Sequence, residues 1–385
     1  MQNLLNSKLP CVSESIFAVM TRMANEFNAI NLSQGFPDFN CSVELLDRVG
    51  YYQKKGFNQY APMPGVKELR ENISKKIEKL HGKRYDPDQE IVITAGATQA
   101  LYTAITTIIN PGDEAIIFEP AYDSYSPAVT LNGGVPIYLP LTKGNYKIDW
   151  DLVGRTLTNR TKLIIINSPH NPSGSILDKH DLTILANITH NKDIFVISDE
   201  VYEHIIFDEK IHYSIAGIPE LSKRAFVVSS FGKTYHTTGW KLGYCAGPES
   251  LMHEFKKIHQ FIVFAVNTPI QYAYADIITN ENMYLSLSKF YQSKRDLIIS
   301  LLANSQFSLI PSSGTYFQLL DYSNISNLND LKFSEYLTKQ KGVAVIPLSP
   351  FYSKGIQEKI IRICFAKRDD VLNNAAQRLN QLKAI

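Results

Sequence analysis

The chain has few cysteines, and their placement argues against two classes of protein. Only Cys11, Cys41, Cys245 and Cys364 occur in 385 residues, and they form no CxxC pair and no Cys/His cluster. Zinc sites and disulfide scaffolds need closely spaced or paired cysteines. We therefore expect no metal site, no disulfide framework and a reducing, cytoplasmic environment.

An excess of charge of one sign is also lacking, as is any long apolar run. The 39 basic and 37 acidic residues leave a formal net charge of +2. Nothing in this balance indicates a nucleic-acid groove or a membrane-seeking face. No stretch approaches the ~20 apolar residues of a membrane span, and the first residues do not join a basic segment to an apolar one as export signals do. We expect small-molecule partners, no nucleic acid and no membrane.

What the sequence does contain is a series of short, β-branched apolar runs. From about Glu90 these runs alternate with longer amphipathic segments, and they are EIVITAG, EAIIFEP, VPIYLP, KLIIINSP, IFVISDE and AFVVSS. Strands that are apolar on both faces belong in a sheet covered by helices on each side. The pattern predicts an α/β fold with a mostly parallel sheet.

The second half of the chain changes character after Gly247. Three helical segments follow, and then strand-like runs alternate with two helices in what we expect to be a smaller α+β domain that begins near Met283. A length of 385 residues, with 44% hydrophobic and 20% charged residues, allows two soluble domains at about 100–200 residues each.

Polar residues follow four of the apolar runs, at the points where the strands should end. These segments are Ala95 to Thr98, Asn167 to Pro172, Asp199 to Tyr202 and Ser229 to Lys233. Ligands of open α/β sheets bind beyond the carboxyl ends of the strands. Each segment alone also has an ordinary explanation as a helix start, a loop, a cap or a solvated lysine.

A phosphate-binding P-loop is a sharper alternative for Gly232-Lys233-Thr234. That motif needs a glycine at position 227, and this chain has Val227 there. The P-loop alternative therefore fails.

Taken together and in this order, the motifs resemble the class I aminotransferases of the pyridoxal-phosphate fold-type I superfamily, and the resemblance spans nearly the whole chain. The segments that carry it are NLSQGFPDF, NQYAPMPG, TAGATQAL, NSPHNPSG, SDEVYEH, SSFGKTYHTTGWKLGY and IRICFAK. The QGFPDF and GKTYHxTGWKxGY segments are most similar to those of methionine aminotransferases and kynurenine aminotransferases. The resemblance implies a large cofactor-binding domain over residues 40–282, with a mostly parallel seven-stranded sheet sandwiched by helices. Residues 1–39 and 283–385 would form an N-terminal arm and a smaller α+β domain.

Lys233 and Lys241 lie eight residues apart in a segment that has no acidic residue and too many glycines and β-branched residues for a comfortable helix. The resemblance implies that Lys233 is the nucleophile, which forms a Schiff base with the cofactor aldehyde and later transfers the substrate proton. A lysine can do so when burial beside other cations lowers its pKa. Lys241 stands where many relatives carry arginine, and it would bind the cofactor phosphate. The further phosphate donors would be Ser230 and the backbone amides of Gly96, Ala97 and Thr98.

The resemblance also assigns residues to the cofactor ring. Asp199 would pair with the pyridine nitrogen and keep it protonated, so that the ring can accept electrons. Asn171 and Tyr202 would hydrogen-bond the phenolic oxygen, and Tyr122 would stack on the ring, although plain core packing is the alternative for Tyr122. Lys233, Asp199 and Tyr202 are thus the expected catalytic residues.

Arg362 is the expected partner of the substrate α-carboxylate, because a guanidinium reads a carboxylate with two parallel bonds. Asn167 and the Gly35 backbone would assist, and a structural ion pair is the alternative for Arg362. Tyr60 would reach the phosphate of a neighbouring subunit, which implies a homodimer with active sites at the interface. The side-chain pocket is expected to contain Phe17, Phe36, Tyr60, Phe264 and Tyr316.

The function implied is transfer of an amino group from a hydrophobic or sulfur-containing L-amino acid to a 2-oxo acid by a ping-pong mechanism. Methionine is favoured, followed by aromatic amino acids, kynurenine and glutamine. A cysteine-conjugate β-lyase would use the same lysine and stays an alternative. A catalytically silent effector domain is an alternative of another class, but it needs a DNA-binding domain for which no residues are left over.

Overall fold

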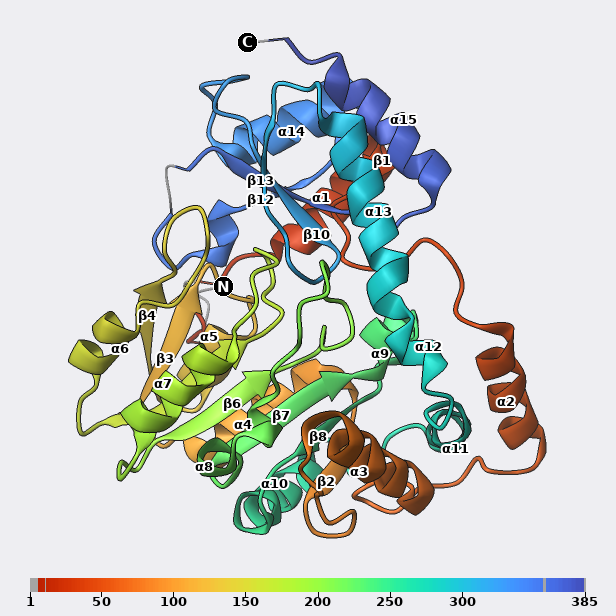
Figure 1. The fold of residues 1–385 in the computed structure, drawn as a ribbon, viewed down its shortest axis with the longest axis vertical. Coiled ribbons are helices and arrows are strands. Elements are labelled where there is room, and N and C mark those ends of the chain that lie inside the picture. Colours follow the sequence, from red (N-terminus) through yellow and green to blue (C-terminus); the bar gives the residue numbers. More distant parts are fainter. Residues whose placement is uncertain (1–5, 11, 356–357, 384–385) are drawn as a thin grey trace.

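The computed structural model describes residues 6–10, 12–355 and 358–383. It contains a large sheet with helices on both faces, in the lower half of Figure 1, and a smaller sheet with its own helices in the upper half. The site described below lies where the two parts meet.

The large sheet has seven strands in the order β2-β8-β7-β6-β5-β3-β4. Its strands are β2 (Ile91–Thr94), β3 (Glu114–Glu119), β4 (Val135–Pro140), β5 (Thr161–Asn167), β6 (Phe195–Asp199), β7 (Ala225–Ser230) and β8 (Gly243–Ala246). Only β8 runs antiparallel to its two neighbours, and the other described pairs are parallel. The predicted mostly parallel seven-stranded sheet is confirmed.

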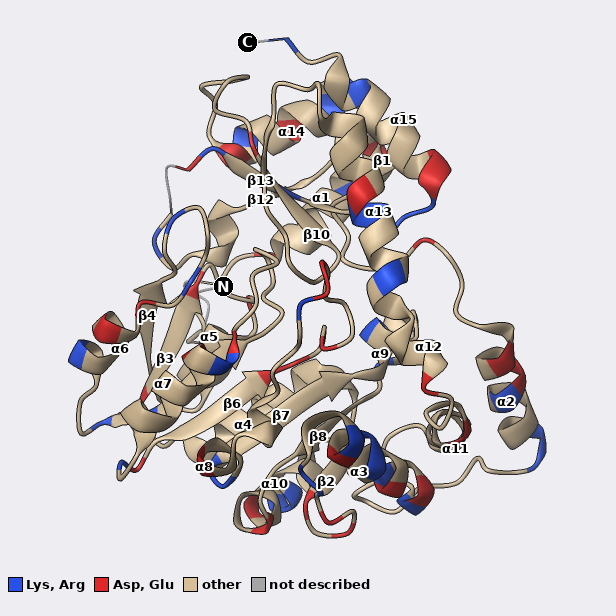
Figure 2. Ribbon diagram, in the orientation of Figure 1, with Lys and Arg blue, Asp and Glu red and all other residues tan. Residues whose placement is uncertain are grey.

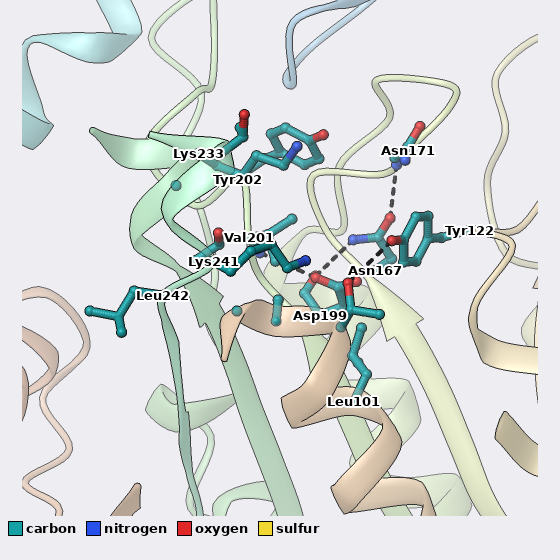
Figure 3. Close-up of a pocket in the computed structure, with 16 residues that line it drawn as sticks. Leu101, Tyr122, Asn167, Asn171, Asp199, Val201, Tyr202, Lys233, Lys241 and Leu242 are labelled. Carbon is teal, nitrogen blue, oxygen red and sulfur yellow. Dashed lines mark hydrogen bonds between the residues drawn. The ribbon is translucent and has the colours of Figure 1, made fainter. Parts of the chain in front are cut away.

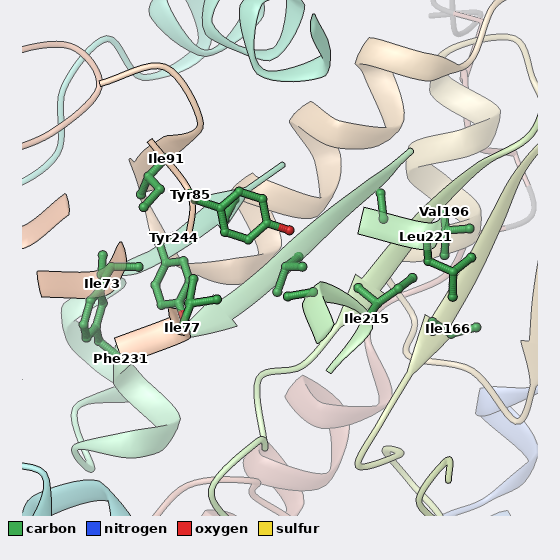
Figure 4. Packing of buried hydrophobic residues seen from close by; sticks show 14 of the residues in the cluster. Ile73, Ile77, Tyr85, Ile91, Ile166, Val196, Ile215, Leu221, Phe231 and Tyr244 are labelled. Atoms are coloured by element: carbon green, nitrogen blue, oxygen red, sulfur yellow. The ribbon is translucent and has the colours of Figure 1, made fainter. Parts of the chain in front are cut away.

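Alternate residues of these strands enter two separate hydrophobic cores, because successive side chains of a strand point to opposite faces. Ile91 and Ile93 pack on one face, and Val92 packs on the other. The first face is covered by α3 (Lys67–His81), α6 (Trp150–Thr156), α7 (Lys179–Thr189), α8 (Pro219–Ser222) and α11 (Thr268–Ile277). Figure 4 shows part of this core, with Ile73 and Ile77 of α3 near Tyr244. The second face is covered by α4 (Gly96–Ile108), α5 (Tyr125–Leu131) and α10 (Glu249–Ile262).

The smaller part contains an antiparallel four-stranded sheet in the order β12-β13-β10-β9. Its strands are β9 (Ser308–Ile310), β10 (Phe317–Asp321), β12 (Ile346–Pro347) and β13 (Ile360–Cys364). The helices that accompany it are α1 (Ile16–Glu26), α13 (Leu287–Leu302), α14 (Asp330–Lys341) and α15 (Asp369–Asn380). A parallel pair of β1 (Ile30–Asn31) and β11 (Val343–Ala344) joins the N-terminal arm to this part.

The remaining described elements are one further helix and several short ones. They are α2 (Val43–Lys54), α9 (Phe231–Thr234), α12 (Asn282–Leu285) and the short 3₁₀ helices η1 (Ile215–Gly217), η2 (Thr238–Trp240) and η3 (Ser349–Phe351). The domain boundaries at residues 40 and 282 stay a prediction.

Acidic and basic residues are interspersed along the outer helices, including α2, α3 and α15 (Figure 2). Cys41, Cys245 and Cys364 are free thiols, and Cys11 lies outside the described residues. Within the described ranges no helix is long and apolar enough to span a bilayer, and no group of three or more His, Cys, Asp or Glu residues is arranged to hold a metal ion.

Candidate active site

A cavity opens at the carboxyl edge of the large sheet (Figure 3). It is lined by the predicted residues Gly96, Ala97, Thr98, Tyr122, Asn167, Asn171, Asp199, Tyr202, Ser230, Lys233 and Lys241, together with Leu101, Val201, Gly232, Thr238 and Leu242. Asn167, Asp199 and Ser230 are the last residues of three adjacent parallel strands, β5, β6 and β7. Parallel strands end at the same edge, which is why residues far apart in the sequence meet there.

Lys233 lies in the short helix α9, where the sequence did not indicate a helix. Its Nζ donates hydrogen bonds to the Gly35 carbonyl at 3.2 Å and to the Tyr316 hydroxyl at 2.9 Å. Burial, helped by the charges of Arg362 and Lys241, lowers the pKa of Lys233 to about 8. Near neutral pH a usable fraction of this amine is therefore uncharged, as a nucleophile requires.

The start of α4, the end of β7 and the start of β8 approach one another closely because of two glycines. Gly96 has φ +75°, and a Cβ added there would lie 3.5 Å from Lys241 Nζ. A Cβ on Gly243 would lie 2.6 Å from the Ser229 carbonyl and 3.0 Å from the Ala97 amide nitrogen. The amides at the start of α4 have no partners inside the helix, so this corner, with the lysine ammonium above it, suits an anion such as a phosphate.

Asp199 is 3% exposed and accepts two hydrogen bonds at its carboxylate. Oδ2 accepts from the Tyr125 hydroxyl at 2.6 Å, and Oδ1 accepts from the Val201 amide at 3.3 Å. No cation of the described residues forms an ion pair with it. Burial raises the pKa of Asp199 to about 6, against the opposing effects of Tyr125, Val201 and the Lys233 charge. Asp199 is therefore a buried carboxylate that lacks a cationic hydrogen-bond donor.

Five further predicted residues line the cavity near Asp199. The backbone carbonyl of Asp199 accepts from Asn167 Nδ2 at 2.8 Å, and Asn167 Oδ1 accepts from the Asn171 amide at 2.8 Å. The Tyr122 hydroxyl lies 3.4 Å from Thr98 Oγ1. Tyr202 is buried, and burial raises the pKa of its phenol, so it stays protonated.

Arg362 lies across from these residues on β13 and is 1% exposed. One terminal nitrogen donates to Asn171 Oδ1 at 2.8 Å and the other to the Ser33 carbonyl at 3.3 Å. Among the described residues, Nε has no hydrogen-bond partner and no carboxylate forms an ion pair with the guanidinium. Burial lowers the pKa of Arg362 to about 10. A direct ion pair is thus not formed among the described residues, although the charge of Asp123 acts on Arg362 from further away. A buried guanidinium without a carboxylate at ion-pair distance suits an anionic ligand.

Aromatic rings enclose the guanidinium of Arg362. Its Cζ lies 3.9 Å from the ring centre of Phe317, 5.2 Å from that of Phe351 and 5.4 Å from that of Phe17. Phe17 and Phe351 are themselves in edge-to-face contact at 5.9 Å. Tyr316, the residue before Phe317, links this group of rings to Lys233. Its hydroxyl donates to the Gly35 carbonyl at 2.6 Å and accepts a hydrogen bond from Lys233 Nζ.

None of the five residues predicted for the side-chain pocket is among those that line this cavity within one chain. Phe17 and Tyr316 lie next to it, beside Arg362 and Lys233, whereas the other three are exposed. Phe36 is 42% exposed, and its carbonyl accepts from Lys367 Nζ at 2.9 Å. Tyr60 is 84% exposed and Phe264 46% exposed, and the two rings make an edge-to-face contact at 5.5 Å. The roles of Tyr60 and Phe264 stay predictions, since they concern a second subunit.

Sequence reasoning missed Tyr125, Phe317 and Phe351. Tyr125 follows Tyr122 by three residues in the sequence EPAYDSY, and Phe317 is next to Tyr316, so both are close in sequence to predicted residues. Phe351 carried no comparable signal, because only the tertiary fold brings its loop to Arg362.

The site fits the expected cofactor, pyridoxal 5′-phosphate, in three respects. The α4 start and Lys241 offer an anion cradle, Asp199 offers a buried acceptor without a cation, and Lys233 offers an amine of lowered pKa beside both. These are the groups that a phosphate, a pyridinium nitrogen and an aldehyde need.

Comparison with known proteins agrees with this geometry. The family model described as aminotransferase class I and II matches residues 28–379. Methionine aminotransferase of Escherichia coli (strain K12) is 48% identical over 377 residues, covering 98% of this chain and 98% of its own. Kynurenine–oxoglutarate transaminase of Dictyostelium discoideum is 33% identical over 409 residues, covering 96% of this chain and 94% of its own.

Solved structures give the same result. The crystal structure of YbdL from Escherichia coli, identified with a methionine aminotransferase function, matches with a TM-score of 0.96 and 47% identity, covering 98% of this chain and 100% of that one. The chain therefore belongs to the class I and II aminotransferase family, and it is an enzyme that transfers amino groups with pyridoxal 5′-phosphate as its cofactor.

Proposed function

We propose that the enzyme transfers the amino group of a hydrophobic or sulfur-containing L-amino acid, methionine first, to a 2-oxo acid in two alternating half-reactions. The observation that carries the proposal is that Lys233, an amine of lowered pKa, lies within electrostatic reach of Arg362, a buried guanidinium whose Nε has no hydrogen-bond partner among the described residues and which lies among aromatic rings. The 48% identity with a methionine aminotransferase supports the choice of first substrate.

The bound cofactor supplies an electron-accepting ring next to the substrate amine. Lys233 is the residue that would hold the cofactor covalently and, once free, move a proton to and from the substrate Cα. The lowered pKa of Lys233 supports this role, because a general base works best when its pKa lies near the working pH. The neighbouring hydroxyl of Tyr316, 2.9 Å away, would keep the amine directed into the site.

The other residues would hold the cofactor in place. The amides of Gly96, Ala97 and Thr98, with Ser230 and Lys241, would bind the phosphate. Asp199 would accept a hydrogen bond from the protonated ring nitrogen. The phenol of Tyr202 and the free amide nitrogen of Asn171 would bind the ring oxygen, and Tyr122 would cover the ring.

Arg362 would bind the substrate α-carboxylate through its guanidinium. Asn171 Oδ1 already accepts from one terminal nitrogen, so this amide would fix the orientation of the guanidinium, while Asn167 and the Gly35 backbone would assist. The attraction between a guanidinium and a carboxylate is strongest where water is excluded, as it is among the aromatic side chains around Arg362.

The pocket for the substrate side chain would be apolar. Phe17, Tyr316 and Phe351 line this side, and we assign Phe36, Tyr60 and Phe264 to its outer parts. A substrate carboxylate moved into such surroundings without a partner costs several kcal/mol, whereas each buried methylene gains about 0.8 kcal/mol. Thioether contacts with aromatic rings add about 0.3–1.5 kcal/mol, which favours methionine over aromatic amino acids, kynurenine and glutamine by a small margin.

We also propose a homodimer with active sites at the subunit interface. Tyr60, Phe261 and Phe264 are exposed to 84%, 85% and 46%, and they lie near the end of α10 and the segment before α3. A cluster of exposed aromatic rings is typical of a protein–protein contact. Tyr60 of each subunit would then complete the phosphate site of the other.

A donor panel tests the proposed function. Purified enzyme is mixed with single amino acids at equal concentration, and loss of the cofactor absorbance band is followed without any acceptor. We expect methionine to give the highest kcat/KM, with aromatic donors close behind and aspartate far below. A higher kcat/KM for aspartate than for methionine and every aromatic donor would contradict the apolar pocket. A cysteine S-conjugate in the same panel, with release of pyruvate as the readout, measures the β-lyase alternative.

A further inference from the structure

Tyr125 makes the shortest hydrogen bond to the Asp199 carboxylate. It is the first residue of α5, and its hydroxyl donates to Oδ2 at 2.6 Å, whereas the Val201 amide donates to Oδ1 at 3.3 Å. Tyr125 is 4% exposed and Asp199 is 3% exposed, so water does not compete with this bond. The carboxylate is therefore held mainly by a residue that does not itself line the cavity.

The rest of the Tyr125 side chain belongs to a hydrophobic core. Its ring packs in the same cluster as Leu101 of α4 and Ala128 of α5, and it meets the ring of Tyr122 edge to face at 5.6 Å. Leu101 and Tyr122 line the cavity. The Tyr125 hydroxyl is thus the polar end of a side chain that is held by packing. Part of that packing comes from α4, the helix that begins at the expected phosphate site.

A phenol that donates to a carboxylate favours the ionised form over the neutral acid, because only the ionised form accepts at both oxygens. Burial and the neighbouring Asp199 charge raise the pKa of Tyr125 well above its usual value, so it stays a donor throughout the working range of pH. Other groups also act on Asp199. Lys233 favours its charge, Glu200 opposes it, and the protonated phenols of Tyr122 and Tyr202 lie close by.

We propose that Tyr125 is a positioning residue for transamination, which keeps Asp199 ionised and turns the free lone pairs of its carboxylate toward the cofactor ring. The inference rests on the proposed role of Asp199 as the partner of the ring nitrogen. Tyr125 does not line the cavity, so it would act only through Asp199.

Tyr125→Phe tests the proposal, because it removes one oxygen and keeps the ring that fills the core. The first readout is the carboxyl titration of Asp199 in the cofactor-free, full-length protein, followed by carbon-13 NMR and assigned with Asp199→Asn. A hydrogen bond to a charged group has the size of about one to two pKa units, so we expect the titration to move upward by about one pH unit or more.

The second readout is the dissociation constant of pyridoxal phosphate measured as a function of pH. A raised pKa leaves Asp199 neutral at a higher pH, so the variant should bind nearly as well as the wild type at pH 8 and at least several-fold more weakly at pH 6. Tyr138→Phe is the matched control, because the Tyr138 hydroxyl bonds Ser126 Oγ at 2.5 Å and does not reach Asp199. We expect it to leave both readouts unchanged.

An Asp199 titration that does not move in Tyr125→Phe would overturn the proposal, whatever the activity of the variant. If that variant fails to fold, 3,5-difluorotyrosine at position 125 replaces it. A more acidic phenol is a stronger donor and should move the titration downward, and an unmoved or upward-moved titration would again overturn the proposal. Failure of the proposed role of Asp199 gives a different result: Asp199→Asn would bind the cofactor as tightly as the wild type. Failure of the proposed substrate class would appear only in the donor panel.

Discussion

The two walls of the active site, the lined cavity and the group of residues around Arg362 next to it, are built differently. One wall is the carboxyl edge of the large sheet, where Asn167, Asp199 and Ser230 end adjacent strands, and two of them hydrogen-bond each other. The other wall comes from the smaller sheet and the 349–353 segment, where Arg362 lies among Phe17, Phe317 and Phe351 without a carboxylate partner. The first wall is polar, and most of its polar groups have hydrogen-bond partners. The second wall is aromatic, and its guanidinium has no carboxylate at ion-pair distance.

This difference assigns different tasks to the walls. A polar, hydrogen-bonded edge holds its side chains in fixed directions before any ligand arrives, which suits a cofactor that stays in place. Burying a guanidinium among aromatic rings without a partner costs free energy, and a bound carboxylate recovers part of that cost. Such a wall suits a substrate that binds and is released in each turnover. Variants of the two walls should therefore affect different ligands.

The largest effect is expected at the first wall, from Lys233→Ala. Without this amine no covalent link to the cofactor can form, so borohydride reduction should fix no cofactor to the protein, and transamination should fall below detection. Lys241→Ala is the matched control, because it removes the nearby exposed lysine and should weaken cofactor binding while the reducible link remains. A reducible link on Lys241 in the Lys233→Ala protein would contradict the assignment.

The second wall should show selectivity for the ligand carboxylate. Charged hydrogen bonds contribute about 1.5–3 kcal/mol each, so Arg362→Ala should reduce kcat/KM for amino acids by roughly 10²–10⁴. Amines without a carboxylate should lose far less, and cofactor affinity should change little. An equal loss for both kinds of ligand would mean that Arg362 acts only on the fold.

A smaller effect is expected where the two walls join. The 349–353 segment is tied to the end of β3 by the Ala121 amide, which donates to the Phe351 carbonyl at 2.8 Å, and by the Ser353 amide, which donates to the Glu119 carboxylate. Glu119→Ala removes the second tie. Losing one such bond, at about 1 kcal/mol, should raise KM for amino acids by roughly five-fold, because Phe351 covers Arg362 less well.

Glu119→Gln is the control for this junction, since an amide oxygen can still accept from Ser353. It should restore most of the amino-acid KM. If Glu119→Ala changes cofactor affinity as much as it changes the amino-acid KM, the segment does not serve the second wall in particular.

The first wall could be predicted from the sequence, and the reason is local. A β-branched run followed by a polar segment marks the end of a buried strand, and parallel strands end at one edge, so the sequence alone predicts that Asp199, Asn167 and Ser230 lie close together. Their motifs also carried the family resemblance. The short helix around Lys233 was not predicted, because it is only four residues long and the segment has low helix propensity.

For the second wall, the sequence determined only single residues. Arg362 was identified by its motif, but its surroundings depend on β13 pairing with β10, which brings up Phe317, and on the loop that returns Phe351 from another part of the chain. Whether a buried arginine has a counter-ion depends on distances between segments that are far apart in the sequence. A sequence pattern does not give these distances. The sequence thus determined which residues have the chemistry of this site, and the tertiary structure decided which of them are left without a partner, because hydrogen bonds and ion pairs form only across distances that packing sets.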